Sequence, residues 1–298
     1  MALFLGIDGG GTKTACVVGD ESTILGHGLA AGSNLVRLGE ARARDALHSA
    51  IRQACGEAKV DPANIAHTCI GIAGAARSDV AEKVRALIAE VVGGTILVVG
   101  DMEITLHAAF GDGPGIIVIA GTGSIAFGRN AQGKTARAGG WGFAISDEGS
   151  GHWIGQHAIA AAMRARDEGT SGILLENILQ SFAVASADEL VIAANAMPPP
   201  DLATLLPPVL NAAEAGDSRA ESVLTQAGGE LAELAHIVIG YLFREKESVP
   251  LAMSGGVFRH SHQVREAFMS KLNASRSGVM VNESVVDPVE GALALARK

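Results

Sequence analysis

The sequence predicts an α/β protein built from two similar halves. Short apolar runs typical of buried strands alternate with amphipathic stretches typical of helices along most of the 298 residues. A strand, a glycine turn and a second strand occur near residue 10 and again near residue 122. This repeat indicates an internal duplication in which each half supplies one loop to a shared cleft. The alternative is a chance likeness between two glycine turns.

The first half opens with a hairpin, because its first apolar run meets a tight turn and then a second β-rich run. Amphipathic helices and further strands follow. In chain order we expect a strand at 3–7, a turn at 8–12, a strand at 14–18, a helix at 40–58, a strand at 68–73, a helix at 80–91 and a strand at 95–99.

The second half repeats the hairpin and is then mostly helical. Residues 197–208 hold five of the nine prolines, so we expect a surface loop there, since proline lacks the amide that a helix needs. We expect strands at 115–120, 125–129 and 250–253, helices at 151–166, 173–194 and 218–243, and a closing helix at 287–297.

Charge and composition exclude several classes of protein. The net charge of −9 argues against a nucleic-acid partner, which would need basic surfaces, although a nucleotide can still bind through backbone amides. The three cysteines, Cys16, Cys55 and Cys69, form no disulfide framework. No signal peptide and no apolar run of about 18 residues is found, so we expect a cytoplasmic protein that does not enter a membrane.

The first glycine turn, Asp8-Gly9-Gly10-Gly11-Thr12, has the residues of a phosphate-binding loop. Glycines let several backbone amides surround one anion, and Thr12 adds a hydroxyl. Asp8 is suited to orienting the waters of a Mg²⁺ ion. The turn is not a Walker A loop, because no Gly-Lys-Ser/Thr follows. The alternative is a hairpin turn whose glycines merely supply positive φ.

A second turn, Gly121-Thr122-Gly123-Ser124, offers amides and two hydroxyls to a phosphate. Alone it is equally consistent with a plain hairpin, but the two turns together predict a clamp on the β- and γ-phosphates of ATP. Gly255 and Gly256 form a third candidate, at which an adenosine would lie against bare backbone. A tight strand-to-helix connection explains them equally well.

Asp101 ends an apolar run at the start of an expected helix. It is either a helix N-cap or a base for a substrate hydroxyl. An aspartate is a weak base, but phosphoryl transfer requires the nucleophile to be aimed more than to be deprotonated. With the two turns present, we predict the catalytic role.

Residues 139–151 combine an indole, two carboxylates and five glycines. Carboxylates accept hydrogen bonds from sugar hydroxyls, so we predict that Asp147 binds substrate, while the role of Glu148 stays open. The alternative is a structured loop whose acids cap the next helix. Trp153 and His157 have helical spacing and are expected in the core or on the surface. Asn34 lies in a loop before a helix, where asparagine is common.

Taken together, these motifs resemble those of a known family. The motifs at 8–12, 121–124, 139–142 and 147–150 follow the order found in N-acetylglucosamine kinases of the BadF/BadG/BcrA/BcrD ATPase family. This family belongs to the superfamily of sugar kinases, actin and the 70-kDa chaperones. The resemblance covers most of the chain and is strongest over residues 4–155. One departure is Asp8, where the animal enzyme has glutamate.

The resemblance implies two RNase H-like domains, with mixed sheets flanked by helices, around a central cleft. The first would comprise residues 1–112, with 287–298 packing back on it, and the second residues 113–286. It also implies roles for individual residues. ATP would contact Gly10, Gly11, Thr12, Thr122, Gly123, Gly255 and Gly256; the sugar would contact Asn34, Asp101, Gly140, Trp141, Gly142 and Asp147; Asp8 would serve Mg²⁺.

The implied reaction is transfer of the γ-phosphate of ATP to the 6-hydroxyl of N-acetylglucosamine, with Asp101 as base, in an enzyme that works as a homodimer. Glucosamine or glucose is the alternative acceptor. Some family members instead activate dehydratases through an iron–sulfur cluster, but no cysteine follows Cys69 to hold one. A non-catalytic sensor on the same fold is the remaining alternative.

Overall fold

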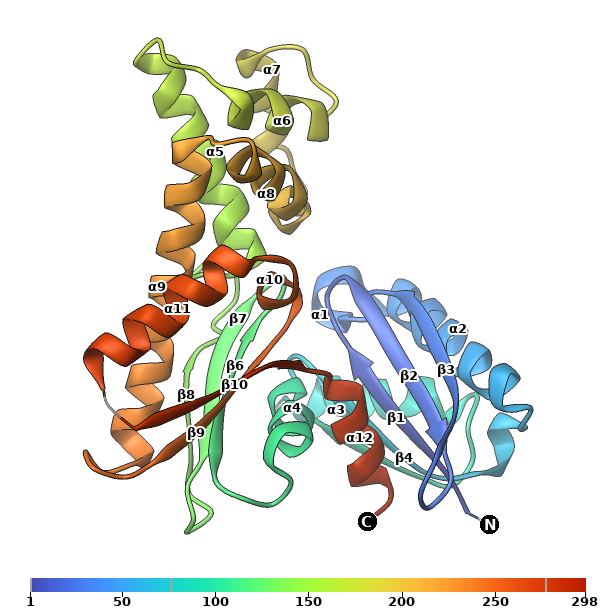
Figure 1. The fold of residues 1–298 in the computed structure, drawn as a ribbon. Coiled ribbons are helices and arrows are strands. Elements are labelled where there is room, and N and C mark those ends of the chain that lie inside the picture. Colours follow the sequence, from blue (N-terminus) through green and yellow to red (C-terminus); the bar gives the residue numbers. More distant parts are fainter. Residues whose placement is uncertain (1, 76, 277) are drawn as a thin grey trace. The chain divides into compact units, whose positions relative to one another are not determined.

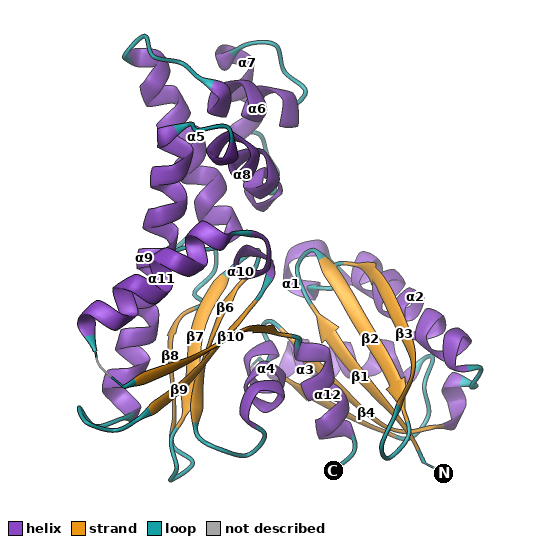
Figure 2. Ribbon diagram, viewed as in Figure 1, coloured by secondary structure: helices purple, strands orange, loops and turns teal. Residues whose placement is uncertain are grey.

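The computed structural model of the chain describes residues 2–75, 77–276 and 278–298. The chain forms two compact units, one of residues 1–117 with 286–298 and one of residues 118–285. Two five-stranded sheets and the helices around them are distinguished by colour in Figure 2. The predicted α/β class is confirmed.

The first unit is built on a mixed sheet with the strand order β3-β2-β1-β4-β5. The central strand β1 is antiparallel to β2 and parallel to β4. The five strands are β1 (Leu3–Gly9), β2 (Lys13–Gly19), β3 (Ile24–Ala31), β4 (Ile65–Ile72) and β5 (Thr95–Val99).

Both faces of this sheet are covered by helices. Because successive side chains of a strand point to opposite faces, one strand contributes residues to both cores. Leu5 and Ile7 of β1 belong to the core on one face, whereas Phe4 belongs to the core on the other. Helices α2 (Glu40–Ala58) and α3 (Ser78–Ala89) supply the first core. The second core is covered by α4 (Asp101–Phe110) and α12 (Pro288–Ala296), with the short α1 (Leu35–Leu38) following β3.

Strand β3 was not expected from the sequence, because its glycines hide the apolar pattern. The structure shows why they are there. A Cβ on Gly26 would lie 2.4 Å from the carbonyl oxygen of Ala54, and one on Gly28 would lie 2.0 Å from that of Ala50. Glycine therefore permits the backbone of α2 to lie directly on the strand.

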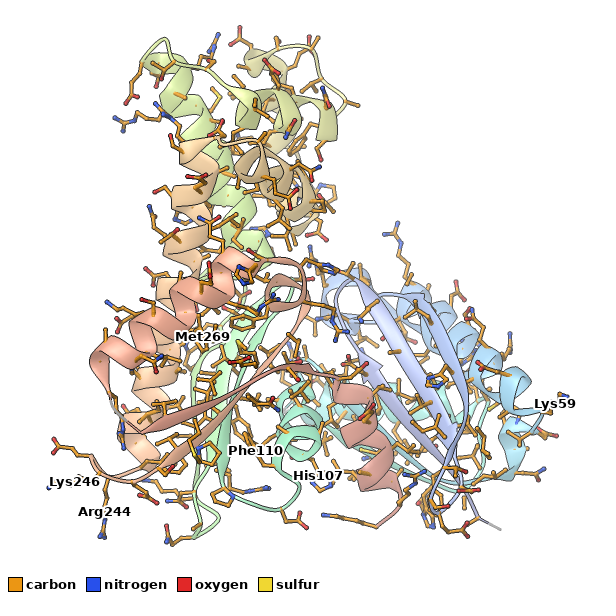
Figure 3. The ribbon with its side chains drawn as sticks, in the orientation of Figure 1. Lys59, His107, Phe110, Arg244, Lys246 and Met269 are labelled. Carbon is orange, nitrogen blue, oxygen red and sulfur yellow. The ribbon has the colours of Figure 1, made fainter. Side chains whose placement is uncertain are left out.

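Helix α4 ends next to the strand that leads into the second unit. Its residues His107 and Phe110 are labelled in Figure 3. A Cβ on Gly115 would lie 2.4 Å from the ring of Phe110. The start of this strand is therefore fixed by an aromatic ring that only glycine leaves room for.

The second unit contains a sheet with the order β10-β9-β6-β7-β8. Read from the other edge, this is the succession of the first sheet, with β6 in the place of β1, as an internal duplication predicts. Strands β8 and β10 were not expected from the sequence. The strands are β6 (Gly115–Ala120), β7 (Ser124–Arg129), β8 (Thr135–Gly139), β9 (Val249–Ser254) and β10 (Val279–Val286).

Helix α9 packs across β7 and β8, and α11 packs on α9. Helices α6, α7 and α8 lie beyond the end of this sheet, at the far end of α5 (Figure 1). The seven helices are α5 (Gly151–Asp167), α6 (Ile173–Ser181), α7 (Ala187–Ala194), α8 (Leu206–Glu214), α9 (Ser218–Leu242), α10 (Gly256–His260) and α11 (His262–Ser275).

Two predictions in this helical region were wrong in detail. The single helix expected at 173–194 is two helices, because the side chain of Ser186 accepts the amide of Glu189 and starts a new one. The proline segment is not all loop. Pro207 and Pro208 lie in the first turn of α8, where a missing amide costs little because those amides have no partner within the helix. Among the described residues, no helix is long and apolar enough to span a membrane.

Candidate active site

The first glycine turn joins β1 to β2 in the first unit. The amide of Gly10 donates to the carbonyl of Lys13 at 3.0 Å and closes the turn. Gly9 and Gly10 do not have positive φ angles, so the alternative that these glycines only supply a left-handed backbone does not hold. Thr12 is exposed at the tip. A Cβ on Gly10 would lie 2.9 Å from the carbonyl oxygen of Lys13, so close packing within the turn accounts for glycine there, and the turn presents bare backbone that an anion can approach.

Carboxylates surround the base of this turn. Burial, followed by the nearby charge of Asp101, raises the pKa of Asp8 to about 7; Lys13 opposes the rise and Asp287 adds to it. Asp8 thus lies among one cation and two further anions of the same unit. Neither Lys13 nor Asp287 was singled out from the sequence, although Lys13 directly follows Thr12 and was readable there.

Asp101 is the first residue of α4, but it is not the N-cap. Gly100 holds that position, and the side chain of Glu103 accepts the amide of Gly100 at 3.1 Å. The carboxylate of Asp101 accepts the amide of Met102 at 3.0 Å. Burial raises its pKa, while the Met102 amide opposes the rise. A raised pKa suits a group that accepts a proton.

Asn34 lies on a loop that is bonded to the first turn. The amide of Ser33 donates to the carbonyl of Gly10 at 3.0 Å. The side-chain oxygen of Asn34 accepts the amide of Arg37 at 3.2 Å and caps α1. The structure therefore places Asn34 beside the phosphate turn, with a capping role for its oxygen and its amide nitrogen left to donate.

The second turn joins β6 to β7, and the amide of Gly121 donates to the carbonyl of Gly123 at 2.9 Å. Neither glycine has a positive φ, and a Cβ on Gly121 would meet nothing closer than 4.0 Å. Within the described parts of the chain, no neighbouring atom therefore requires glycine at 121, and the space beside its backbone is open. The expectation that Ser124 caps a phosphate was wrong, because its hydroxyl is buried and donates to the carbonyl of Glu148 at 2.7 Å.

Asp147 lies directly against this second turn. Its carboxylate accepts the amide of Ser124 at 3.4 Å, and a Cβ on Gly123 would lie 2.9 Å from it. The residue is 8% exposed and has a φ of 71°. This backbone is strained for a residue other than glycine, and such strain is concentrated at functional sites. Glu148 accepts a hydrogen bond from Ser146 at 2.7 Å.

Trp141 is 60% exposed, and the guanidinium of Arg137 lies 4.1 Å from the centre of its ring. Gly140 and Gly142, on either side, have φ angles of 69° and 93°. An exposed indole between two glycines is a surface on which the apolar face of a sugar can stack. Trp153 and His157 stack on one another at 3.6 Å within α5.

The two glycines at the start of α10, Gly255 and Gly256, differ in their surroundings. Gly255 has a φ of 100°, and a Cβ there would lie 2.3 Å from the carbonyl of Ala120. Its glycine is required by the packing of α10 on the end of β6. A Cβ on Gly256 would meet nothing closer than 4.0 Å, so Gly256 leaves space for a ligand.

Within each unit, the structure thus gathers residues that the sequence only suggested. The first unit holds Asp8, Gly10, Thr12, Asn34 and Asp101. The second holds Thr122, Gly123, Asp147 and Gly255 around the end of β6. The three cysteines are free and buried, and burial raises the pKa of each thiol, which disfavours the thiolates that an iron–sulfur cluster needs.

Comparison with known proteins shows where the chain belongs. The model of the BadF/BadG/BcrA/BcrD ATPase family matches residues 5–296. An N-acetylmuramic acid/N-acetylglucosamine kinase of Clostridium acetobutylicum is 32% identical over 100% of this chain and 99% of its own. An N-acetyl-D-glucosamine kinase of Dictyostelium discoideum is 28% identical over 99% and 97%.

A solved structure shows the same relationship. The structure assigned as an N-acetylglucosamine kinase from Chromobacterium violaceum is 27% identical, covers 99% of both chains and superposes with a TM-score of 0.80. Together with the two glycine turns, these matches confirm the resemblance drawn from the motifs. The chain belongs to the BadF/BadG/BcrA/BcrD ATPase family and is a kinase of that family.

Proposed function

We propose that the enzyme transfers the γ-phosphate of ATP to the 6-hydroxyl of N-acetylglucosamine. The observation that carries the proposal is the glycine turn of each unit. The glycines are not there to supply a positive φ, and each turn lies beside a residue assigned to the sugar, Asn34 in one unit and Asp147 in the other. The named activities of the relatives support a sugar acceptor.

The two turns would bind the triphosphate. Amides at Gly11 and Gly123 and the hydroxyls of Thr12 and Thr122 would donate to its oxygens, which is how backbone sites hold an anion in a protein of net charge −9. Gly10, whose own amide closes the turn, would contact the phosphates through its bare backbone. Gly256 would leave room for the nucleoside, with Gly255 beside it. Lys13 would add a positive charge close to the first turn.

A magnesium ion would be held mainly by ATP itself. No group of three or more His, Cys, Asp or Glu side chains in the described parts of the chain is arranged to hold a metal. Mg²⁺ with a nucleotide needs only one or two carboxylates besides phosphate oxygens and waters. Asp8 fits that need, and the ion would supply neutralisation of the charge that develops on the transferred phosphoryl group.

Asp101 would act as the base. The sugar O6–H bond breaks as the carboxylate accepts its proton, O6 forms a bond to the γ-phosphorus, and the bond from that phosphorus to the bridging oxygen breaks. ADP leaves with the bonding electrons. The carboxylate accepts the amide of Met102, and its two oxygens retain acceptor capacity for the hydroxyl.

The sugar would rest on the Trp141 loop and on Asn34 and Asp147. Asn34 has its amide nitrogen to donate, and Asp147 is an acceptor, so the two can bind different hydroxyls. Gly140 and Gly142 would let the backbone approach the ring. The group that faces the 2-position is unassigned, so glucosamine and glucose stay as alternative acceptors, and N-acetylmuramic acid joins them from the relative's named activity.

The test is an ADP-release assay with Mg-ATP and each of N-acetylglucosamine, N-acetylmuramic acid, glucosamine and glucose. We expect the highest kcat/KM with N-acetylglucosamine, and phosphorus–proton coupling in the NMR spectrum of the product to place the phosphate on O6. The Asp101→Asn variant is the matched control. Absence of sugar-dependent ADP release with every acceptor would contradict the proposal.

We also propose that the enzyme works in the cytoplasm as a homodimer without a nucleic-acid or membrane partner. Light scattering of the purified protein measures the oligomeric state, and fractionation of cells that produce it measures the location. A monomer at all concentrations would remove the dimer and leave the reaction unaffected.

A further inference from the structure

In each unit, the strand that leaves the glycine turn carries one buried hydroxyl. Thr14 on β2 is 0% exposed, and Ser124 on β7 is 4% exposed. Neither hydroxyl is accessible to a ligand. Each is bonded instead to the loop that carries the residue assigned to the sugar, so the same arrangement occurs twice in the molecule.

In the first unit, the Thr14 hydroxyl lies 2.7 Å from the carbonyl oxygen of Ala31 and 2.8 Å from the hydroxyl of Ser33. A hydroxyl has one proton. If Thr14 donates it to Ala31, then Ser33 donates its own to Thr14, and both bonds are made. The pair thus holds residues 31–33, immediately before Asn34, on the strand that follows the turn.

Backbone contacts make this connection stiff. The amide of Ser33 donates to the carbonyl of Gly10 at 3.0 Å. A Cβ on Gly32 would lie 2.2 Å from the carbonyl oxygen of Gly11, so the loop and the phosphate turn touch backbone to backbone. Movement of one therefore displaces the other.

In the second unit, the Ser124 hydroxyl donates to the carbonyl of Glu148 at 2.7 Å. The Ser124 amide donates to the carboxylate of Asp147 at 3.4 Å. Beyond these, the amide of Gly151 donates to Gly121 at 2.8 Å and that of His152 donates to Thr122 at 3.2 Å. The loop with Asp147 is thereby bonded along the whole second turn.

We propose that Thr14 and Ser124 are positioning residues of the kinase reaction. Each hydroxyl fixes a loop that binds the sugar against a turn that binds the phosphates of ATP, so that acceptor hydroxyl and γ-phosphate are held at a constant separation. The inference rests on the proposed function, because the loops are those assigned there. An error of about 1 Å in such a separation lowers a rate by about 100-fold.

The variants that test this are Thr14→Val, which keeps the shape and removes the hydroxyl, and Ser124→Ala. Thr14→Ser restores the hydroxyl and is the conservative variant. The matched control is Thr68→Val, because Thr68 is buried in the same sheet as Thr14 and its hydroxyl has no hydrogen-bond partner among the residues that the structure describes. Should Thr14→Val fail to fold, Ser33→Ala removes the same bond between the loop and the strand with a smaller change.

We expect Thr14→Val and Ser124→Ala to lower kcat/KM for the sugar about 10- to 100-fold while the Kd for ADP, measured by calorimetry, stays at the wild-type value. Thr14→Ser should recover most of the rate, and Thr68→Val should match wild type. Ser33→Ala combined with Thr14→Val should lose little more than either alone, because both remove one connection.

Three results would overturn the inference: rates for Thr14→Val and Ser124→Ala that equal that of Thr68→Val, loss of ADP affinity in proportion to the rate, or no recovery in Thr14→Ser. The first would mean that the hydroxyls are inert, and the second that the turn itself has collapsed. A wild-type enzyme that phosphorylates no sugar would overturn both this inference and the proposed function, whereas an active wild type with unaffected variants overturns this inference alone.

Discussion

The two glycine turns share a backbone plan but differ in their surroundings. Around the first turn, burial and the charges of Asp101 and Asp287 raise the pKa of Asp8, with Lys13 opposing them. Beside the second turn, Asp147 is bonded to the Ser124 amide, and its loop owes its course to left-handed residues, Gly140, Gly142, Asp147 and Gly149 among them. The first unit thus brings charged side chains together around its turn, whereas the loop beside the second turn is shaped by residues with a left-handed backbone.

This difference predicts different roles for the two units in the reaction. Interacting carboxylates in a partly buried place have perturbed pKa values, which is what proton transfer and a metal–nucleotide complex use. A loop fixed by left-handed residues and close backbone contacts has one shape, which is what discrimination between sugars uses. Substitutions in the first unit should therefore change the chemical step, and those in the second should change shape and binding.

The largest effect is expected from Asp101→Asn in the first unit. The amide cannot accept the proton of the sugar hydroxyl, so kcat should fall about 100- to 10,000-fold, while the Kd for ATP is unchanged. Steady-state kinetics and calorimetry measure the two quantities. A kcat close to wild type would show that Asp101 is not the base. It would also contradict the proposal that the first unit carries the chemical step.

The next effect is on stability and belongs to the second unit. Gly149 has a φ of 74°, and a Cβ there would lie 2.5 Å from the carbonyl oxygen of Ala227. Gly149→Ala should therefore lower the free energy of unfolding by about 2 to 4 kcal/mol, the left-handed backbone contributing about 1 to 2 of it and the steric overlap the rest. Urea denaturation measures the change.

Gly142→Ala is the matched control for that change. Gly142 also has a positive φ, 93°, but a Cβ there would meet nothing within 4 Å. The free energy of unfolding should therefore fall only by the cost of placing alanine in a left-handed backbone, about 1 to 2 kcal/mol. Equal losses for both variants would show that close packing does not fix the loop.

A smaller effect is expected from Asp147→Asn. Asparagine tolerates the left-handed backbone and keeps the shape of the side chain, so the loop should stay in place while the acceptor charge is lost. We expect KM for the sugar to rise about tenfold, as for one charge-assisted hydrogen bond, with kcat changed less. A loss confined to kcat would assign Asp147 to the chemical step. It would contradict the proposal that the second unit acts only in sugar binding.

The smallest effect concerns pH and the charge of the first unit. The pKa of Asp8 is raised from 3.8 to about 7, so the folded protein holds this proton more tightly than the unfolded chain does. The resulting stability is complete below about pH 4 and is lost as the pH rises through 7. Replacing the carboxyl removes this dependence.

We therefore expect Asp8→Asn to gain on the order of 1 kcal/mol over wild type between pH 5 and pH 8. The measurement is urea denaturation of both proteins, without nucleotide, at several values of pH in that range. Parallel stability curves would mean that neither burial nor the charge of Asp101 raises the pKa of Asp8 in the folded state.

Elements with strong apolar periodicity were predicted well from the sequence. The helix at 40–58 has the predicted bounds because its apolar residues repeat at the period of a helix, and the strand at 95–99 has them because it is a short apolar run rich in β-branched residues. Strand β10 was missed because none of its residues is buried and the polar residues 282–284 interrupt its apolar run. The two turns were found because glycines next to an acid or a threonine are unusual for a plain hairpin.

The sequence by itself determined the α/β class, the repeated hairpin and the identity of the residues that could bind phosphate or sugar, because composition and spacing are local properties of the chain. Only the tertiary structure decided how those residues are used. The hydroxyl of Ser124 is buried and donates to Glu148 instead of meeting a phosphate, and a close approach to Ala120 makes Gly255 a packing residue. Burial, together with the charge of Asp101, raises the pKa of Asp8. Each of these depends on which distant segment lies alongside, since hydrogen bonds, steric overlap and electrostatic coupling act between neighbours in space.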